Sequence, residues 1–327
     1  MTTISYSEAL RDALREELRA DSDVFLLGED IGVYGGAFGV TRGLLGEFGP
    51  ERIRNTPISE PGFVGAAIGA AFTGCRPVVE IMFMDFMTLI MDQLVNMAAK
   101  ARYVYGAPAT CPLVIRTAAG GGKGYGPTHS QMFEAWLLHA PGLKVVAPAT
   151  PADAKGLLKT AIRDDNPVIV VEHKLLYGRK GPVPAGDVCV PFGKARLARE
   201  GTDVTIVAWS WMAVEAEAAG EELAAHGIRA EVLDLRSLNP MDVDGIVASA
   251  QKTHRLLIVE EGTRTGGVAA EIGFRVFERI YDYLDAPITR LTTPDIPVSA
   301  SSVLEKAAIP DRRRIVQAVR RLMGQEA

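Results

Sequence analysis

Mostly apolar strand-like runs alternate with helix-like stretches along most of this chain, and this alternation limits the possible folds more than any other feature. The first series of runs lies at residues 24–28, 77–83, 113–116, 143–147 and 168–172. A second, shorter series lies at residues 204–209, 230–234, 256–260 and 288–291. Runs that are apolar along their length, rather than at every second residue, are typical of parallel strands with helices on both faces of the sheet.

The two series are separated by residues 176–201, where glycine and proline are frequent and the alternation weakens. A chain of 327 residues is long enough for about two domains. We therefore predict an α/β fold with two doubly wound domains. The first spans residues 1–185, a linker follows at 186–200, and the second domain spans 201–327.

Charge and hydropathy argue against two classes of partner. The net charge is −5, and no basic tract is long enough to attract nucleic acid or an anionic membrane surface. The longest apolar stretch, residues 78–91, contains Glu80 and Asp85 and is too short to cross a bilayer. We expect neither nucleic acid nor membrane as a partner.

The cysteines indicate a reducing compartment. Cys75, Cys111 and Cys189 are far apart, odd in number and match no metal-binding spacing, so reduced thiols are expected. The chain does not start with a basic region followed by an apolar core. A cytoplasmic location is the resulting expectation.

Three common catalytic or nucleotide-binding motifs are missing. Lys123 lies in a glycine run but is followed by Gly124, so the phosphate-binding pattern G-x-x-x-x-G-K-[ST] is not formed. No G-x-G-x-x-G enters a helix after a strand, and no G-x-S-x-G is present. The sequence therefore does not favour a P-loop, a chain that binds NAD by itself, or an α/β-hydrolase.

Glu60 is the most informative carboxylate, because it stands where a loop enters a Gly/Ala-rich segment that we predict to be helical to about Thr73. One interpretation is an acid that the helix dipole favours at a helix start. The other is a carboxylate in an apolar pocket, with a raised pKa, that exchanges a proton with a ligand nitrogen. The position of Glu60 in the sequence does not decide between these two interpretations.

Two further side chains have a structural and a functional interpretation. His129 follows the glycine run 120–126, where core packing explains a histidine less easily than a general acid or base does. Phe86 ends an apolar run, which favours core packing, although its flat ring can also stack on a heteroaromatic ligand.

The turn at residues 161–167 follows a predicted helix. The free carbonyls at the end of that helix can bind a monovalent cation, but water or capping groups satisfy them more often.

Several short motifs occur in a fixed order at residues 56–60, 83–86, 129–131, 141–146, 153–158, 162–167 and 259–262. Their sequences are Thr56-Pro-Ile-Ser-Glu60, Phe83-Met-Asp-Phe86, His129-Ser-Gln131, Pro141-Gly-Leu-Lys-Val-Val146, Asp153-Ala-Lys-Gly-Leu-Leu158, Ile162-Arg-Asp-Asp-Asn-Pro167 and Val259-Glu-Glu-Gly262. Together they resemble the β subunits of pyruvate, branched-chain 2-oxo acid and acetoin dehydrogenases, and the resemblance covers nearly the whole chain.

This resemblance implies a transketolase-like pyrimidine-binding domain followed by a transketolase C-terminal-like domain used mainly in assembly. It also implies an α2β2 heterotetramer with thiamine diphosphate at the α/β boundary. In that family the α subunit holds the diphosphate and Mg²⁺ through a Gly-Asp-Gly…Asn motif. No Gly-Asp-Gly occurs in this chain, as expected of a separate β subunit.

The resemblance also implies roles for individual residues. Glu60 matches the glutamate that hydrogen-bonds a ring nitrogen of the aminopyrimidine and favours its imino tautomer. Phe86 matches the aromatic residue packed on the pyrimidine, and Ile58 is expected to line the same pocket. His129 matches the histidine that handles protons or hydrogen bonds on the substrate side and during transfer to lipoamide. Main-chain K⁺ ligands in several relatives match Leu113, Ala161, Asp164 and Asn166.

The implied reaction is oxidative decarboxylation of a 2-oxo acid, with pyruvate as the preferred substrate, and transfer of the acyl group to a lipoyl group on the acyltransferase core. The glycine-rich segments 32–40 and 120–131 look close to acetoin-dehydrogenase β subunits and to bacterial pyruvate enzymes. Acetoin cleavage is therefore an alternative. Two others are a catalytically silent assembly subunit and a self-contained transketolase-like enzyme, the last disfavoured by the missing diphosphate motif.

Overall fold

A computed structural model describes residues 1–106 and 108–325, and the chain divides by its contacts into two compact units. The first unit comprises Met1–Ala119 and Trp136–Phe192, and the second comprises Gly120–Ala135 and Gly193–Ala327. The segment Gly120–Ala135 thus belongs to the second unit, which the alternation of strands and helices did not indicate. The domain limits 1–185, 186–200 and 201–327 stay a prediction.

The first unit is built on a parallel sheet, as predicted. Its strands lie side by side in the order β6 (Lys144–Val146), β7 (Val168–His173), β5 (Val114–Ala119), β4 (Arg76–Ile81), β2 (Val24–Gly28) and β3 (Ile53–Asn55). All of these neighbouring pairs are parallel. Every residue of β5 and β7 is buried, which explains why these strands are apolar along most of their length.

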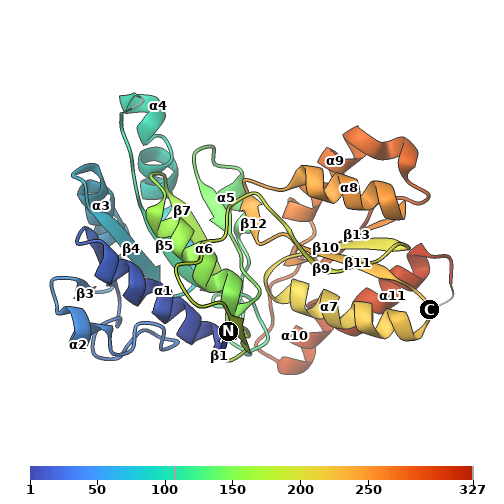
Figure 1. Ribbon diagram of the computed structural model, residues 1–327, viewed down its shortest axis with the longest axis horizontal. Coiled ribbons are helices and arrows are strands. Elements are labelled where there is room, and N and C mark those ends of the chain that lie inside the picture. Colours follow the sequence, from blue (N-terminus) through green and yellow to red (C-terminus); the bar gives the residue numbers. More distant parts are fainter. Residues whose placement is uncertain (107, 326–327) are drawn as a thin grey trace. The chain divides into compact units, whose positions relative to one another are not determined.

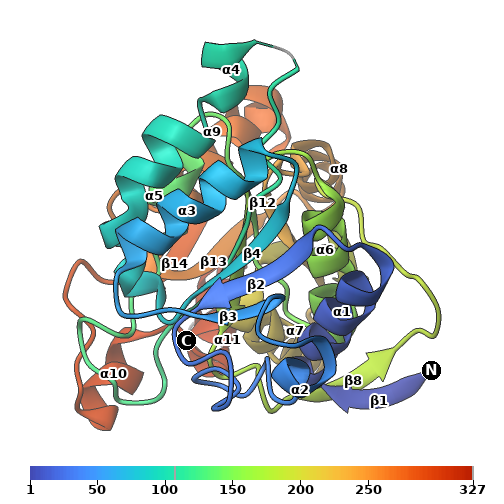
Figure 2. The same cartoon turned by 90° about the vertical axis from the view of Figure 1, so that its left-hand side faces the viewer.

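Helices cover both faces of this sheet. Figure 2 shows α1 (Tyr6–Ala20) and α6 (Pro151–Arg163) on one side of β2 and β4, and α3 (Glu60–Phe72) on the other. The start of α1 carries a capping box, because Ser5 Oγ accepts the Glu8 amide at 3.3 Å while the Glu8 carboxylate accepts the Ser5 amide at 2.7 Å. The unit also contains α2 (Leu44–Phe48) and an antiparallel pair formed by β1 (Thr2–Ser5) and β8 (Lys180–Val183).

The strand predicted at residues 77–83 ends earlier, because β4 stops at Ile81 and short helical turns follow it. A 3₁₀ helix, η1 (Met84–Ile90), is followed by a π-helical turn, η2 (Gln93–Ala98), and by α4 (Ala101–Tyr105). Met84, Met87 and Ile90 are buried at intervals of three residues, which is the period of a 3₁₀ helix. Phe86 therefore lies on η1 and not at the end of a strand.

The second unit is a smaller α/β layer structure, also as predicted (Figure 1). Its strands are ordered β14 (Thr289–Thr293), β13 (Leu256–Thr263), β10 (Val204–Ala208), β11 (Ala230–Asp234) and β9 (Arg196–Arg199), with only β9 antiparallel to its neighbour. Its longer helices are α7 (Ser210–Ala225), α8 (Val243–Thr253), α9 (Val268–Ile280) and α11 (Arg312–Leu322). Shorter elements are β12 (Ser237–Asn239), η3 (Tyr281–Tyr283) and α10 (Ser302–Ala308), while α5 (Glu134–Leu138) runs from the second unit into the first.

The cysteines behave as predicted, since Cys75, Cys111 and Cys189 are free thiols. Burial raises the pKa of the Cys111 thiol to about 12, so this group stays protonated at neutral pH. None of the described helices has both the length and the apolarity that a membrane crossing needs.

Candidate functional site

Glu60 lies at the start of α3, where the predicted helix begins. The main-chain carbonyl of Ser59 accepts the amides of Gly62 and Phe63, and Pro61 occupies the first turn, where its missing amide proton costs nothing. The Glu60 side chain is only 6% exposed. The sequence therefore produces a buried carboxylate at the positive end of a helix, and both interpretations of Glu60 remain compatible with this position.

A second buried carboxylate, which the sequence did not single out, lies close to the first. Glu29 directly follows β2, and its Oε1 atom has no hydrogen-bond partner in the part of the chain that the structure describes. Burial and the negative charges of Glu60 and Asp30 raise the pKa of Glu29. The only sequence signal was its position after a buried parallel strand, because ligands of such sheets bind at the carboxyl ends of the strands.

Aromatic rings connect the loop after β2 with η1. Phe86 is partly exposed and meets Phe83 edge to face at 5.8 Å between ring centroids. Phe83 meets Phe38 at 5.8 Å, and Phe38 stacks on Tyr177 at 4.8 Å. Because α3 contacts η1, the helix that carries Glu60 and the element that carries Phe86 lie against each other. Ile58, on the loop before Glu60, is 84% exposed.

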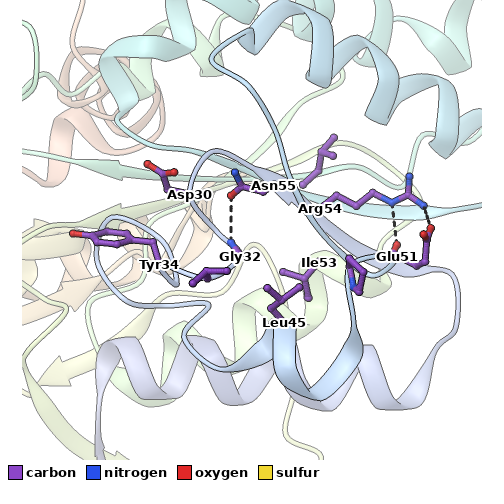
Figure 3. A pocket seen from close by; sticks show the side chains of 11 residues that line it. Asp30, Gly32, Tyr34, Leu45, Glu51, Ile53, Arg54 and Asn55 are labelled. Atoms are coloured by element: carbon purple, nitrogen blue, oxygen red, sulfur yellow. Dashed lines mark hydrogen bonds and ion pairs between the residues drawn. The ribbon is translucent and has the colours of Figure 1, made fainter.

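A cavity of about 980 Å³ lies elsewhere in the first unit, beside the carboxyl ends of β2 and β3 (Figure 3). Its lining includes Asp30, Tyr34 and Asn55, whose side-chain oxygen accepts the Gly32 amide at 3.4 Å. Neither Glu60 nor the other predicted site residues line it. This cavity is therefore not the predicted pyrimidine pocket.

His129 lies in the second unit, on the segment Gly120–Ala135. It is partly exposed, and its Nδ1 atom is 3.0 Å from the hydroxyl of Thr128. Glu60, Phe86 and Ile58 share the first unit, so the predicted site residues are divided between the two units.

Two buried carboxyl groups of the second unit have strongly raised pKa values. Burial, reinforced by the charge of Glu261, raises the pKa of Glu134 to about 7 although Trp209 Nε1 donates to its Oε1 atom at 3.2 Å. Burial and the charge of Glu134 raise the pKa of Glu260 to about 7, against the opposing effect of two main-chain amides at the start of α9. Glu260 lies in the motif Val259–Gly262, but no role was predicted for it or for Glu134.

The predicted main-chain ligands of K⁺ lie in the first unit, near the end of α6 and the starts of β5 and β7. The carbonyl of Leu113 accepts the Val168 amide at 2.9 Å, and the carbonyl of Ala161 accepts the Asp164 amide at 3.3 Å. Asn166 donates its main-chain and side-chain N–H groups to the Asp164 carboxylate at 2.9 and 2.8 Å.

Cationic side chains already neutralise part of this helix end. The Arg76 guanidinium donates to the carbonyls of Ile162 and Asp164 at 3.1 and 3.2 Å, and Lys144 forms an ion pair with the Asp164 carboxylate. These contacts satisfy helix-end carbonyls in the way that capping groups do. A bound K⁺ would need the remaining carbonyl lone pairs, beside the charge of Arg76.

Comparisons with known proteins also divide the chain in two, but the first match includes residues 120–135, which the contacts assign to the second unit. Residues 2–180 match the transketolase pyrimidine-binding domain, and residues 193–315 match the transketolase C-terminal domain. The chain is 47% identical over 321 residues to the pyruvate dehydrogenase E1 component subunit beta of Rhizobium meliloti (strain 1021), covering 98% of this chain and 70% of that protein. It is 46% identical over 318 residues to the mitochondrial pyruvate dehydrogenase E1 component subunit beta-1 of Oryza sativa subsp. japonica, covering 96% and 85%.

A solved structure supports the fold alone. The inactive beta4 tetramer of a split-gene transketolase superposes with a TM-score of 0.81 at 24% identity, covering 99% of this chain and 100% of the other. Both units of the chain therefore have a counterpart of known architecture.

Proposed function

The chain belongs to the family of E1 β subunits of 2-oxo acid dehydrogenase complexes, and on this basis we propose that it is the β subunit of a thiamine-diphosphate-dependent pyruvate dehydrogenase component. The observation that carries the proposal is the 47% identity to a pyruvate dehydrogenase E1 β subunit over 98% of the chain. No relative reported above is an acetoin dehydrogenase, so pyruvate is the preferred substrate over acetoin.

The first unit offers groups suited to the aminopyrimidine half of the cofactor. Glu60 would hold a proton at a ring nitrogen, and its burial keeps water from competing for that hydrogen bond. The partly exposed ring of Phe86, on an element that contacts α3, and the exposed side chain of Ile58, two residues before Glu60, offer apolar surface for the ring of the pyrimidine. When bound, thiamine diphosphate supplies the electron sink for decarboxylation.

The diphosphate half of the cofactor requires a partner chain. This sequence has no Gly-Asp-Gly, and within residues 1–106 and 108–325 no three His, Cys, Asp or Glu side chains are grouped to hold a metal ion. We assign the diphosphate and Mg²⁺ to an α subunit in an α2β2 heterotetramer. His129 would handle protons or hydrogen bonds on the acyl group and during its transfer to a lipoyl group on the acyltransferase core.

The free thiols favour a cytoplasmic location for the protein.

The test is dye reduction by this chain reconstituted with a matching α subunit, thiamine diphosphate and Mg²⁺. Pyruvate, branched-chain 2-oxo acids and acetoin are compared as substrates. We expect activity with pyruvate that requires both subunits. Glu60→Gln should lower kcat by about 10²- to 10⁴-fold without changing the thermal midpoint, because the amide cannot exchange the proton.

A matched control is Glu51→Gln, which makes the same change at an exposed side chain of the first unit. This variant should retain the activity of the wild type. Near-normal turnover of Glu60→Gln would refute the role of Glu60, and acetoin cleavage without pyruvate turnover would replace pyruvate as substrate. A well-formed heterotetramer that is inactive with every substrate would favour a silent assembly subunit.

We also propose that the main-chain carbonyls of Leu113, Ala161, Asp164 and Asn166 bind K⁺. The proposal is supported by their proximity at one end of α6 and opposed by the Arg76 charge. Thermal unfolding of the heterotetramer in KCl, NaCl and choline chloride at equal ionic strength tests it. Binding at 100 times Kd stabilises a protein by about 2.7 kcal/mol, so K⁺ should raise the midpoint by several degrees. Equal midpoints in the three salts would exclude a specific K⁺ site.

A further inference from the structure

We propose that Glu261 and Glu305 are positioning residues whose carboxylates hold the glycine-rich loop of residues 120–126 and thereby fix the location of His129. This inference rests on the proposed role of His129 in catalysis. It gives the second unit, which was expected to serve mainly in assembly, a direct part in shaping the active site.

The backbone of the loop is folded to bind anions. Gly120, Gly122, Gly124 and Gly126 have φ angles of 85°, 86°, 70° and 79°, in the left-handed region, and they alternate with other residues. Such alternation turns nearby N–H groups toward one side and creates a concave site for negative charge. Only glycine adopts these angles without strain, which explains the repeated glycines of this segment.

Two carboxylates of the same unit occupy this site. The Gly121 amide donates to Glu261 Oε1 at 2.6 Å, and the Gly122 amide donates to Glu305 Oε1 at 2.8 Å. The Gly124 amide donates to Glu305 Oε2 at 3.1 Å. Hydrogen bonds to an ionised acceptor are roughly twice as strong as those between neutral groups, so these contacts are strong anchors for a loop.

The loop amides also stabilise the two carboxylates, because both carboxylates are buried and need hydrogen-bond donors. Glu305 is 2% exposed and Glu261 is 7% exposed. Among the residues that the structure describes, no lysine or arginine forms an ion pair with Glu305. A buried carboxylate without hydrogen bonds is costly, and here the loop amides supply them. Displacement of the loop would therefore leave Glu305 buried and poorly satisfied.

Close packing accompanies the hydrogen bonds. A Cβ atom on Gly121 would lie 2.4 Å from Ile309 Cδ1 and 3.0 Å from Glu305 Oε1. A Cβ atom on Gly126 would lie 3.4 Å from the Ala300 side chain. The residues on and around α10 thus contact the loop directly, which leaves the loop little room to shift.

The other end of the segment is also held within the second unit. Glu134 is buried, and its carboxylate accepts the indole N–H of Trp209. His129 lies between these two anchors, and its ring is oriented by the neighbouring Thr128 hydroxyl at 3.0 Å. A displacement of about 1 Å at a catalytic group can cost about 10²-fold in rate, so these anchors have a kinetic consequence.

Hydrogen exchange of the full-length chain tests the anchoring without any assay of activity. We compare the wild type with Glu305→Ala, Glu305→Gln and Glu221→Ala, the last being an exposed glutamate on α7 of the same unit. The amides of residues 121–124 should exchange at least about tenfold faster in Glu305→Ala, and to an intermediate extent in Glu305→Gln, which retains an acceptor oxygen. Glu221→Ala should match the wild type. Unchanged exchange in both Glu305 variants would overturn the proposal.

A double-mutant cycle in the reconstituted heterotetramer then tests the link to His129. Glu305→Ala should lower kcat for acyl transfer to lipoamide by about 10- to 100-fold with little change in KM for pyruvate. On a His129→Ala background the same substitution should have almost no further effect, because it acts through His129. Glu305→Gln should recover part of the loss. Multiplicative effects of the two substitutions would overturn the proposal.

The two proposals fail in different ways. A wild-type complex that does not turn over pyruvate would contradict the proposed function, while the exchange result for residues 121–124 would still stand. A wild-type complex that is active, with Glu305→Ala equally active, would contradict the positioning role alone.

Discussion

The two units hold their candidate catalytic groups by different means. In the first unit, Glu60 lies on the first turn of a regular helix that packs on its own sheet. In the second unit, His129 lies on an irregular loop whose glycine amides bind carboxylates that are distant in sequence. A group on a helix start is located by local sequence, whereas a group on such a loop is located only once the tertiary structure has formed.

The two units also differ in how particular buried carboxylates are stabilised. In the first unit, the Arg116 guanidinium forms two hydrogen bonds of 2.8 Å with Glu172 and one of 2.7 Å with Glu80, so these two carboxylates have a counter-charge. In the second unit, burial raises the pKa of both Glu134 and Glu260 to about 7, because nearby carboxylates reinforce the effect and neutral donors, with Arg290 near Glu260, oppose it only in part. Near neutral pH, the stability of the second unit should therefore respond more strongly to pH.

The largest expected effect on stability concerns the counter-charge of the first unit. Arg116→Met should reduce the free energy of unfolding by about 3–5 kcal/mol, because it leaves Glu172 buried without its partner. Urea unfolding at pH 7 measures the loss. Adding Glu172→Gln to Arg116→Met should recover part of it, because the unpaired buried charge is removed. A single variant as stable as the wild type would show that the ion pair contributes nothing net.

A smaller effect is expected in the second unit, and it should depend on pH. The folded-state pKa of Glu134 lies above its ordinary value of 4.5, so the folded protein binds this proton more tightly than the unfolded chain does. The stability contributed by the protonated group is complete below about pH 4.5 and is lost as the pH rises toward 7. Glu134→Gln should therefore stabilise the protein by about 1–3 kcal/mol at pH 8 and change little at pH 5.

Thermal unfolding of Glu134→Gln from pH 5 to pH 8 checks this sign. The glutamine retains an oxygen that can accept the Trp209 indole N–H, so the anchor of the loop is kept while the charge is removed. The control is Glu221→Gln on the exposed side of α7. A variant that is less stable than the wild type at pH 8 would show that the Glu134 charge is favourable and the contrast between the units wrong.

The smallest expected effect tests whether a change at the start of α1, in the first unit, leaves the loop of the second unit unaffected. Ser5→Ala removes the side-chain half of the capping box of α1 and should destabilise the protein by about 1 kcal/mol. Ser22→Ala, at an exposed serine just after α1, is the control for the loss of a hydroxyl. Hydrogen exchange of residues 121–124 should not change in Ser5→Ala. Faster exchange there would mean that the loop depends on the first unit as well.

Sequence patterns predicted the regular elements well where a single local signal was sufficient. The strand Val24–Gly28 and the helix that starts at Glu60 appear as expected. The segment after β4 was predicted less well, because its buried residues repeat every three positions and a short window does not separate that period from 3.6. The roles of Glu60, Phe86, Ile58 and His129 remain predictions.

By itself, the sequence determined the fold class and the helix start that carries Glu60, because apolar periodicity acts between neighbours in the chain. Its short motifs, in their fixed order, indicated the family. Only the tertiary structure decided that Glu29 lies near Glu60 and that the 120–126 loop is held by Glu261 and Glu305. These carboxylates are 140 and 183 residues away in sequence from the amides they bind. No local sequence pattern predicts these hydrogen-bonded pairs, because the buried carboxylates and the loop amides meet only when distant elements pack together.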